Sequence, residues 1–297
     1  MLKKPMLCLF VAMLVTSFST LAFAATNVNV TVNDFSNPGP GVQSVANGSG
    51  TVDWRQGVIE AHGFGVAPAQ YASMAQARIM ARRAAIVDGY RNLAEAVKGV
   101  QVDAESTLLN FQLADDMVRT RVSALIQGAR VISEKQTADG GYEVVMVLNL
   151  YGDSSLDKIV MESPQMSQQT PIPQPASSIA YTDKVTGIVV DARGLGLEPV
   201  MAVKVFDQSG RVIYGNQYVD PNYQISRGLA DYIFTDDDLQ SITDGQSRAG
   251  NAPITVRAVG LRDNNCNIVI SNEDGDKILS ANRTSGFIQK CAVVLEK

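Results

Sequence analysis

The alternation of apolar and polar positions divides the chain into stretches with helical spacing and stretches with strand spacing. The longest helical stretch is 69–98, which contains no proline. Steps of three and four residues connect one row of this stretch, in which only Arg82 is not apolar: Ala75, Ile79, Arg82, Ile86, Tyr90, Leu93 and Val97. This spacing predicts an amphipathic helix, opened by Pro68, that buries the row. Seven alanines from Ala69 to Ala85 leave little side-chain bulk, so we expect the helix to lie close against a sheet.

Stretches with strand spacing occur on both sides of this helix. We expect strands at 51–65 and 100–108, and a hairpin at 130–152 whose turn has the sequence Asp-Gly-Gly. A second helix is predicted from Asp115 to Gly128, because an acidic residue suits the start of a helix and glycine its end. The order strand, helix, strand, helix, strand, strand predicts an α+β fold with two helices on a mostly antiparallel sheet.

Composition marks the boundaries between the parts of the chain. After the first 24 residues we expect a flexible arm (25–50), a first module (51–152), a linker rich in Pro, Gln and Ser (153–180) and a second module (181–297). The arm alternates like a strand only at 26–32. The second module is predicted to be a β-rich α+β domain with a short helix capped by Thr235 and Asp238. Its strands are expected at 187–192, 199–206, 211–215, 253–260, 266–271 and 291–296.

The first 24 residues have the composition of a cleaved secretory signal peptide. Lys3 and Lys4 precede an apolar run from Met6 to about Phe18, and small residues lead up to Ala24. We therefore predict cleavage after Ala24 and a periplasmic or secreted location. The remaining chain has 23 basic and 30 acidic side chains, a formal charge of −7, which argues against nucleic acid as a partner.

Cysteine and histidine are scarce in the predicted exported chain. Cys266 and Cys291 are its two cysteines, and an even pair in an exported protein predicts one disulfide between them. His62 is the single histidine, so every Ser-His-Asp or Cys-His mechanism would require it. It lies next to Gly63 near the end of an expected strand, where a structural or surface histidine is the ordinary case. We therefore predict no catalytic residue and expect His62→Ala to leave folding nearly unchanged.

Two Gly-x-Gly steps follow expected strands, at Gly63–Gly65 and at Gly194–Gly196. A dinucleotide-binding fingerprint needs a third glycine three residues after the second, and Pro68 and Pro199 occupy those positions. We interpret both steps as tight turns and predict no cofactor.

A family resemblance covers the first module. The runs ARRAAIVDGYRNLAEAVKGVQVDAEST and DDMVRTRVSALIQGARVISEKQTADGGYEVVMVLNLYG resemble the envelope lipoprotein family named for its twenty-kilodalton founding member. They are also similar to the N-terminal domain of the flagellar H-ring protein FlgT. The second module, with TGIVVDARGLGLEPVMAVKVFDQSG, resembles the C-terminal part of longer exported proteins that contain such modules. The resemblance implies a non-catalytic role in the envelope or in appendage assembly, although this chain lacks the lipidated cysteine of the lipoprotein members.

These observations predict a non-enzymatic exported protein with a binding or assembly role at the periplasm or outer membrane, flagellar association included. The expected partner is an envelope protein or appendage component, and peripheral membrane association and self-association through an open sheet edge are compatible with this role. The alternative is a secreted hydrolase that uses acidic residues of the second module. Its acidic clusters, at 236–238 and 274–276, lack the ligand spacing of a calcium loop, so no metal site is predicted. Whether two of these carboxylates converge depends on the fold.

Overall fold

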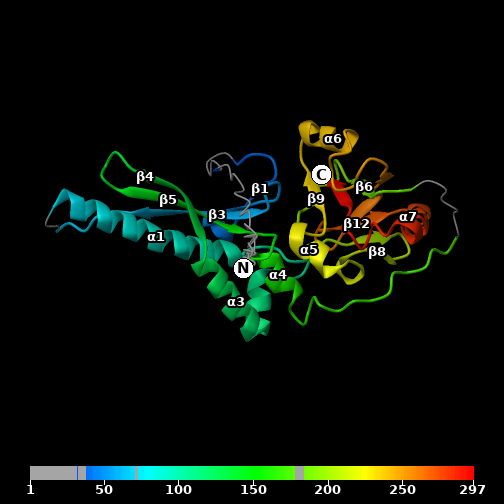
Figure 1. Ribbon diagram of the computed structural model, residues 1–297, viewed down its shortest axis with the longest axis horizontal. Helices are drawn as coiled ribbons and strands as arrows, with labels where there is room; N and C mark the ends of the chain where they lie inside the picture. The colour runs from blue at the N-terminus through cyan, green and yellow to red at the C-terminus, as the bar shows by residue number, and fades with distance from the viewer. Residues whose placement is uncertain (1–31, 33–37, 71–72, 178–183) are drawn as a thin grey trace, which may run out of the picture. The chain divides into compact units, whose positions relative to one another are not determined.

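A computed structural model describes residues 32, 38–70, 73–177 and 184–297 (Figure 1). The predicted signal peptide lies outside the described residues. So does the strand expected at 26–32, except for Val32, which has no regular secondary structure. The described chain forms one five-stranded sheet and two four-stranded sheets with helices, which confirms the α+β class.

The first module is built on the five-stranded sheet, in which all neighbours are antiparallel. Its order is β1 (Val42–Val45), β2 (Gly50–Asp53), β3 (Val58–Gly65), β5 (Tyr142–Asn149) and β4 (Arg130–Gln136). The segment expected as one strand at 51–65 is therefore two strands. The predicted arm also contributes to the sheet from Val42 onward, through β1 and a 3-10 turn at Ala46–Gly48. The hairpin expected at 130–152 is present, closed by a hydrogen bond from Thr137 N–H to the Gly141 carbonyl at 3.0 Å.

The long helix α1 (Met74–Lys98) packs on β3 and β5 (Figure 1). It begins after Ser73, whose hydroxyl accepts a hydrogen bond from the Gln76 N–H, and not at Pro68. Its buried residues are Ala77, Ala81, Ala85, Gly89, Leu93, Ala96 and Val97. The predicted buried row is therefore wrong in its first half, where Ile79 is 68% exposed.

Close contact with β3 explains which side of α1 is buried. A Cβ atom added to Gly63 would lie 2.2 Å from the Ala85 carbonyl oxygen, and one added to Gly65 would lie 2.2 Å from that of Ala81. The helix backbone thus lies directly against the strand backbone. Only alanine and glycine fit along this contact, so the larger apolar residues of the N-terminal half of α1 are turned away from the sheet.

Two further helices follow α1, where the sequence predicted a strand and one helix. The expected strand at 100–108 is reduced to a single bridge between Gln101 and Thr107, and α2 (Leu108–Ala114) begins directly after it. Val100 and Val102 are fully buried although they belong to no strand, which accounts for the misleading pattern. The predicted second helix is confirmed as α3 (Asp116–Gln127), capped by Asp115 and ended at Gly128.

The predicted linker does not begin as an extended chain. It starts with α4 (Leu156–Met161), whose Ile159 and Val160 are buried in the core. Residues 164–177 then run without regular secondary structure beyond turns.

The second module contains the two four-stranded sheets, and some of their strands are labelled in Figure 1. One is parallel throughout, in the order β10 (Ile254–Arg257), β6 (Ile188–Asp191), β13 (Val293–Glu296) and β9 (Asp231–Ile233). The other has the order β11 (Gly260–Arg262), β12 (Asn267–Ile270), β7 (Val205–Asp207) and β8 (Val212–Tyr214), with β12 and β7 parallel and the other pairs antiparallel. The remaining elements are a 3-10 turn at Asn216–Tyr218, α5 (Pro221–Arg227), α6 (Asp236–Thr243) and α7 (Asn272–Ser285). The predicted cap of α6 is confirmed, since the Thr235 hydroxyl accepts from the Asp238 N–H at 3.3 Å.

Contacts between the modules explain why the strand expected at 199–206 forms only at its end. The N–H groups of Met201 and Ala202 donate to the carbonyls of Gln101 and Val102, at 3.2 and 2.7 Å. The Trp54 ring also packs edge-on against Tyr232, at 5.8 Å between ring centroids. Buried residues of the two modules therefore form one shared core.

Candidate functional site

An open groove of about 520 Å³ lies between the end of β3 and one flank of α1. Phe64, Val66 and Pro68 line one side of it. The side formed by α1 consists of Met80, Arg83, Ala84, Val87, Asp88 and Arg91. Val66 is 72% exposed and Phe64 58% exposed, although both are apolar. The groove is therefore an apolar surface with charged groups beside it.

The edge of β3 at this groove is closed by side chains of α1. β2 pairs with β3 only from Val58 to Glu60. Farther along, the Phe64 N–H donates to a carboxylate oxygen of Asp88 at 3.0 Å, and the Asn92 amide donates to the His62 carbonyl at 2.8 Å. These bonds satisfy a backbone N–H group and a backbone carbonyl that would otherwise be free to pair with another strand. A ligand in the groove would consequently contact side chains more than strand backbone.

The charges of α1 give this surface a positive character. The helix contains five basic and two acidic side chains. Arg82 is paired with Glu134 through two hydrogen bonds of 2.7 and 2.6 Å. Arg78 and Arg83 are exposed and have no ion pair in the described part of the chain. They are available to an acidic ligand.

His62 lies on β3 between two carboxylates. Its Nδ1 is 2.9 Å from Glu143 Oε1, and its Nε2 is 3.5 Å from Glu60 Oε1. Partial burial lowers the pKa of His62, but the two glutamates outweigh that effect, and the pKa lies above the ordinary value of 6.5. Because the Glu60 side chain is fully buried, the imidazolium is the natural counter-charge inside the sheet. Because His62 contacts both glutamates, its replacement is no longer expected to leave folding nearly unchanged.

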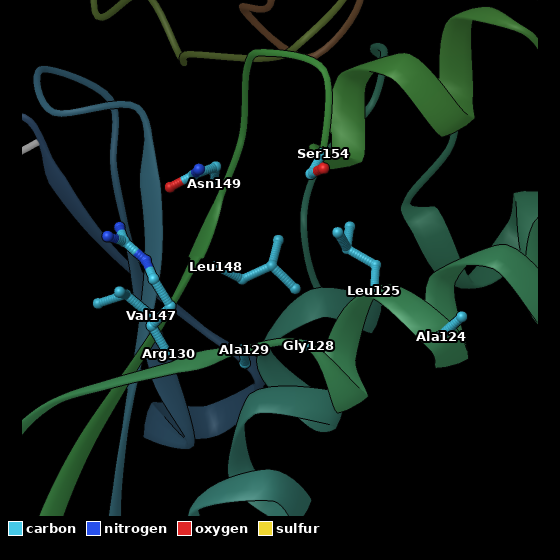
Figure 2. A pocket seen from close by; sticks show the side chains of 9 residues that line it. All are labelled: Ala124, Leu125, Gly128, Ala129, Arg130, Val147, Leu148, Asn149 and Ser154. Atoms are coloured by element: carbon cyan, nitrogen blue, oxygen red, sulfur yellow. The ribbon is translucent and has the colours of Figure 1, made fainter. Parts of the chain in front are cut away.

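A second pocket, of about 380 Å³, lies where α3 ends and β4 begins. Figure 2 shows Leu125 of α3 and Leu148 of β5 beside each other in it, with Asn149 and Ser154 also contributing. Arg130 is the one ionisable residue of its lining. A pocket with this lining has neither a nucleophile with an adjacent base nor paired carboxylates.

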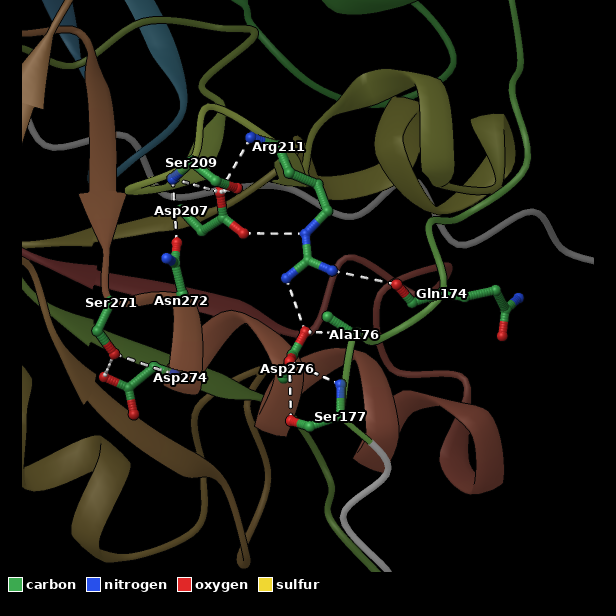
Figure 3. A network of polar contacts seen from close by, with 10 residues as sticks. All are labelled: Gln174, Ala176, Ser177, Asp207, Ser209, Arg211, Ser271, Asn272, Asp274 and Asp276. Carbon is green, nitrogen blue, oxygen red and sulfur yellow. Dashed lines mark hydrogen bonds and ion pairs between the residues drawn. The ribbon is translucent and has the colours of Figure 1, made fainter.

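The acidic residues of the second module have structural partners. Figure 3 shows Arg211 between Asp207 and Asp276, at 2.9 and 2.7 Å. Asp276 also accepts the backbone N–H groups of Ala176 and Ser177, both at 2.9 Å. Burial acts to raise the pKa of Asp276, but these hydrogen bonds outweigh it and hold the pKa well below its usual value. Asp276 therefore fastens the end of the predicted linker to α7.

Two of the other acidic residues singled out from the sequence, Asp274 and Asp238, lie at the starts of helices. The Asp274 carboxylate accepts from the Ser271 hydroxyl at 2.8 Å at the start of α7. Asp238 accepts from the Thr235 hydroxyl and pairs with Arg55 at 2.6 Å, while Asp236 and Asp237 are exposed. Among the described residues, no group of three or more His, Cys, Asp or Glu is placed to hold a metal ion. Within the same residues, no helix has the length and apolar content needed to span a membrane.

The predicted disulfide between Cys266 and Cys291 is not formed in this structure, where both described cysteines are free and buried. The two thiols have different surroundings. Cys266 Sγ is 3.5 Å from the Asn264 carbonyl oxygen, whereas Cys291 contacts the Tyr214 hydroxyl. Burial raises the pKa of Cys291 to about 11, so its thiol is a poor nucleophile.

Asp157 of α4 is an ionisable group inside the core. It is fully buried, and neither carboxyl oxygen has a hydrogen bond of normal geometry within the described residues. Burial raises the pKa of Asp157 well above its ordinary value, and the Gln224 amide offsets this only in part. Burial therefore favours the protonated form of this carboxyl group over the ionised form.

The groove was not predicted from the sequence. The predicted buried row included Ile79, and no role was predicted for Phe64, Met80 or Val87. The available signal was the excess of apolar residues in 69–98 over what a single buried face requires, because Met80 and Val87 lie outside the predicted row.

Comparison with known families concerns the second module. Residues 187–295 match the family model described as Treponema pallidum Tp0624, second domain. The match begins just before β6 and ends within β13, so it spans both four-stranded sheets. No curated protein matches the chain. The likeness thus covers the second module, whereas the groove belongs to the first.

Proposed function

We propose that this chain is a non-enzymatic exported protein of the cell envelope, which binds another protein during assembly of an envelope structure or appendage. The groove between β3 and α1 carries this proposal. Six of the thirteen large apolar side chains that are exposed in the described structure belong to this end of the first module: Phe64, Val66, Met74, Ile79, Met80 and Val87. Clustered exposed apolar side chains favour burial against a partner.

The arrangement supports binding by a preformed surface. The groove is fixed by the packing of α1 on Gly63 and Gly65 and by the hydrogen bonds of Asp88 and Asn92. A partner would therefore meet side chains that are already positioned, which reduces the entropy lost on binding. The location and the kind of partner come from the signal-like first 24 residues and from the resemblance to envelope lipoproteins.

The competing proposal, a secreted hydrolase, would require two carboxylates free to act on one substrate. Asp276 is engaged with Arg211 and the linker, and Asp238 is engaged with Arg55 and Thr235. These engagements favour the binding function over the hydrolase.

A matched pair of valines tests the proposal. Val87, in the groove, is 54% exposed, and Val259, in the second module, is 53% exposed. The immobilised full chain and its variants Val87→Ser and Val259→Ser would be incubated with an envelope extract, and the captured proteins quantified by mass spectrometry. We expect Val87→Ser to lose at least about tenfold of a specific partner, corresponding to about 1.4 kcal/mol, while Val259→Ser retains it. Equal capture by both variants would remove the groove as the binding site.

A further inference from the structure

We propose that the groove binds a second copy of this chain, which docks through the exposed side of α2 and the first turn of α3. The inference rests on the proposed function of the groove and names its occupant. Two surfaces of the first module carry it, one basic and one acidic.

The basic surface consists of Phe64, Met80, Val87 and Arg83, all of which line the groove. Arg83 has no ion pair among the described residues. Three acidic side chains lie nearby: Asp88 is 3.9 Å from Arg91, Glu95 pairs with Lys98 at 2.8 Å and Glu134 pairs with Arg82. The surface therefore attracts an acidic, apolar partner.

The acidic surface consists of Leu109, Leu113, Met117 and Asp116. Leu109 and Leu113 are one helical turn apart on α2, and Leu113 is 73% exposed. Met117 is exposed in the first turn of α3, next to Asp116, whose side chain extends into solvent and pairs only with the exposed Arg119. Residues 101–121 contain four acidic side chains and two basic ones, Arg119 and Arg121, so this segment is negative on balance. The acidic surface is therefore an apolar patch with negative charge, whereas the basic surface is an apolar patch with positive charge.

The complementarity of the two surfaces selects a second copy over an anionic membrane. A membrane would attract the basic surface but repel the acidic one, and it would leave Leu109, Leu113 and Met117 exposed. A second copy covers both patches and opposes Arg83 to Asp116. Because the two surfaces differ, the contact is heterologous, and each docked copy still offers one free surface to the next.

Reversal of the two charges tests this contact in the full chain. Sedimentation velocity at low salt should show association of the wild type that increases with protein concentration and weakens as salt is added. Arg83→Glu and Asp116→Lys should each weaken association at least tenfold, and the double variant carrying both changes should recover it. Circular dichroism would check that each variant is folded, and Val87→Ser provides an uncharged disruption of the same contact, with Val259→Ser as its control.

Mixing supplies a test that only a heterologous contact passes. The Arg83→Glu chain keeps an intact acidic surface and the Asp116→Lys chain an intact basic one, so an equimolar mixture should associate when neither variant does alone. A wild type that stays monomeric at every concentration, or a double variant as weak as the single ones, would overturn the inference. Flotation of a monomeric wild type with vesicles of anionic lipid would assign the basic surface to a membrane instead. If the wild type is monomeric but Val87→Ser still loses its captured partner, the proposed function stands and the second copy is excluded.

Discussion

The two Gly-x-Gly steps have the same sequence spacing and different physical roles. Gly63 and Gly65 lie in a strand, and a Cβ atom at either position would collide with the backbone of α1 at 2.2 Å. Gly194 and Gly196 both have φ of +78°, and nothing lies within 4 Å of the place where a Cβ atom would be. The first pair is glycine because a helix fills the space, and the second because its backbone conformation disfavours other residues. The tight-turn interpretation was therefore right for the second pair and wrong for the first.

The comparison shows that close packing at two glycines can determine which residues of a neighbouring helix are exposed. Because Gly63 and Gly65 allow the backbone of α1 to pack directly on β3, the helix buries its alanines there and exposes Ile79, Met80 and Val87. The binding surface is thus a consequence of the close packing behind it. Substitutions at packed and unpacked positions should separate the two roles by the size of their effects.

The largest effect is expected for Gly63→Ala. The added methyl group meets helix backbone, which cannot move aside as a side chain can, so the free energy of unfolding should fall by about 3 kcal/mol or more. Denaturant unfolding followed by circular dichroism measures it. A loss below about 1 kcal/mol would show that α1 shifts easily and would remove the contrast between the two glycine pairs.

Asp157→Asn extends the comparison to a buried ionisable group that has no ion pair among the described residues. The pKa of Asp157 in the folded chain is raised above its unfolded value of about 3.9, so the folded state retains a proton that the unfolded state loses as pH rises. Wild-type stability should therefore fall relative to that of Asp157→Asn as pH rises above the unfolded-state pKa of about 3.9. Parallel pH profiles of the two proteins would contradict the raised pKa of Asp157.

His62→Gln tests an ionisable group that, unlike Asp157, has neighbours of opposite charge. The raised pKa of His62 means that its contribution is fully present below about pH 6.5 and is lost as pH rises through the folded-state pKa. We expect a cost of about 1 to 2 kcal/mol at pH 5.5, because Glu60 and Glu143 lose their counter-charge, and a smaller cost at pH 9. Urea titrations at both pH values provide the measurement, and a cost independent of pH would exclude the charged pairing.

Gly194→Ala should have a moderate effect. The position is open, so only the left-handed backbone conformation is penalised, at about 1 kcal/mol. Gly194→Asn should cost less, since asparagine adopts this conformation more readily. Equal losses for Gly194→Ala and Gly63→Ala in the same denaturant assay would remove the distinction between conformation and packing.

The smallest effect is expected for Ile79→Ser. Its side chain contributes little to the core despite its place in the predicted buried row, so stability should change by less than about 0.5 kcal/mol. A shift of several degrees in the melting temperature would mean that the original row is buried after all.

Local chemistry explains which parts of the fold the sequence predicted well. The start of α3 at Asp115, its end at Gly128 and the Asp-Gly-Gly hairpin depend on neighbours in the chain, and all three were predicted correctly. The buried face of α1 depends on Gly63 and Gly65, and the run at 199–206 depends on carbonyls of Gln101 and Val102. Apolar periodicity does not record such distant contacts, and large apolar residues therefore appeared to be buried.

The groove was hidden for the same reason. Its edge is closed by Asp88 and Asn92, which bond to Phe64 and His62 from 24 and 30 residues away. Exposure of Val87 follows only once the helix is placed on the strand.

Site-specific photo-crosslinking tests the central claim, that this exposed flank of α1 is a binding surface, most directly. A photoreactive amino acid would be introduced into the full chain at Val87 or, as a control of equal exposure, at Val259. Irradiation of the native envelope should yield a discrete crosslinked protein species from position 87 and none from position 259. The absence of a crosslink from position 87, or the same products from both positions, would contradict the account.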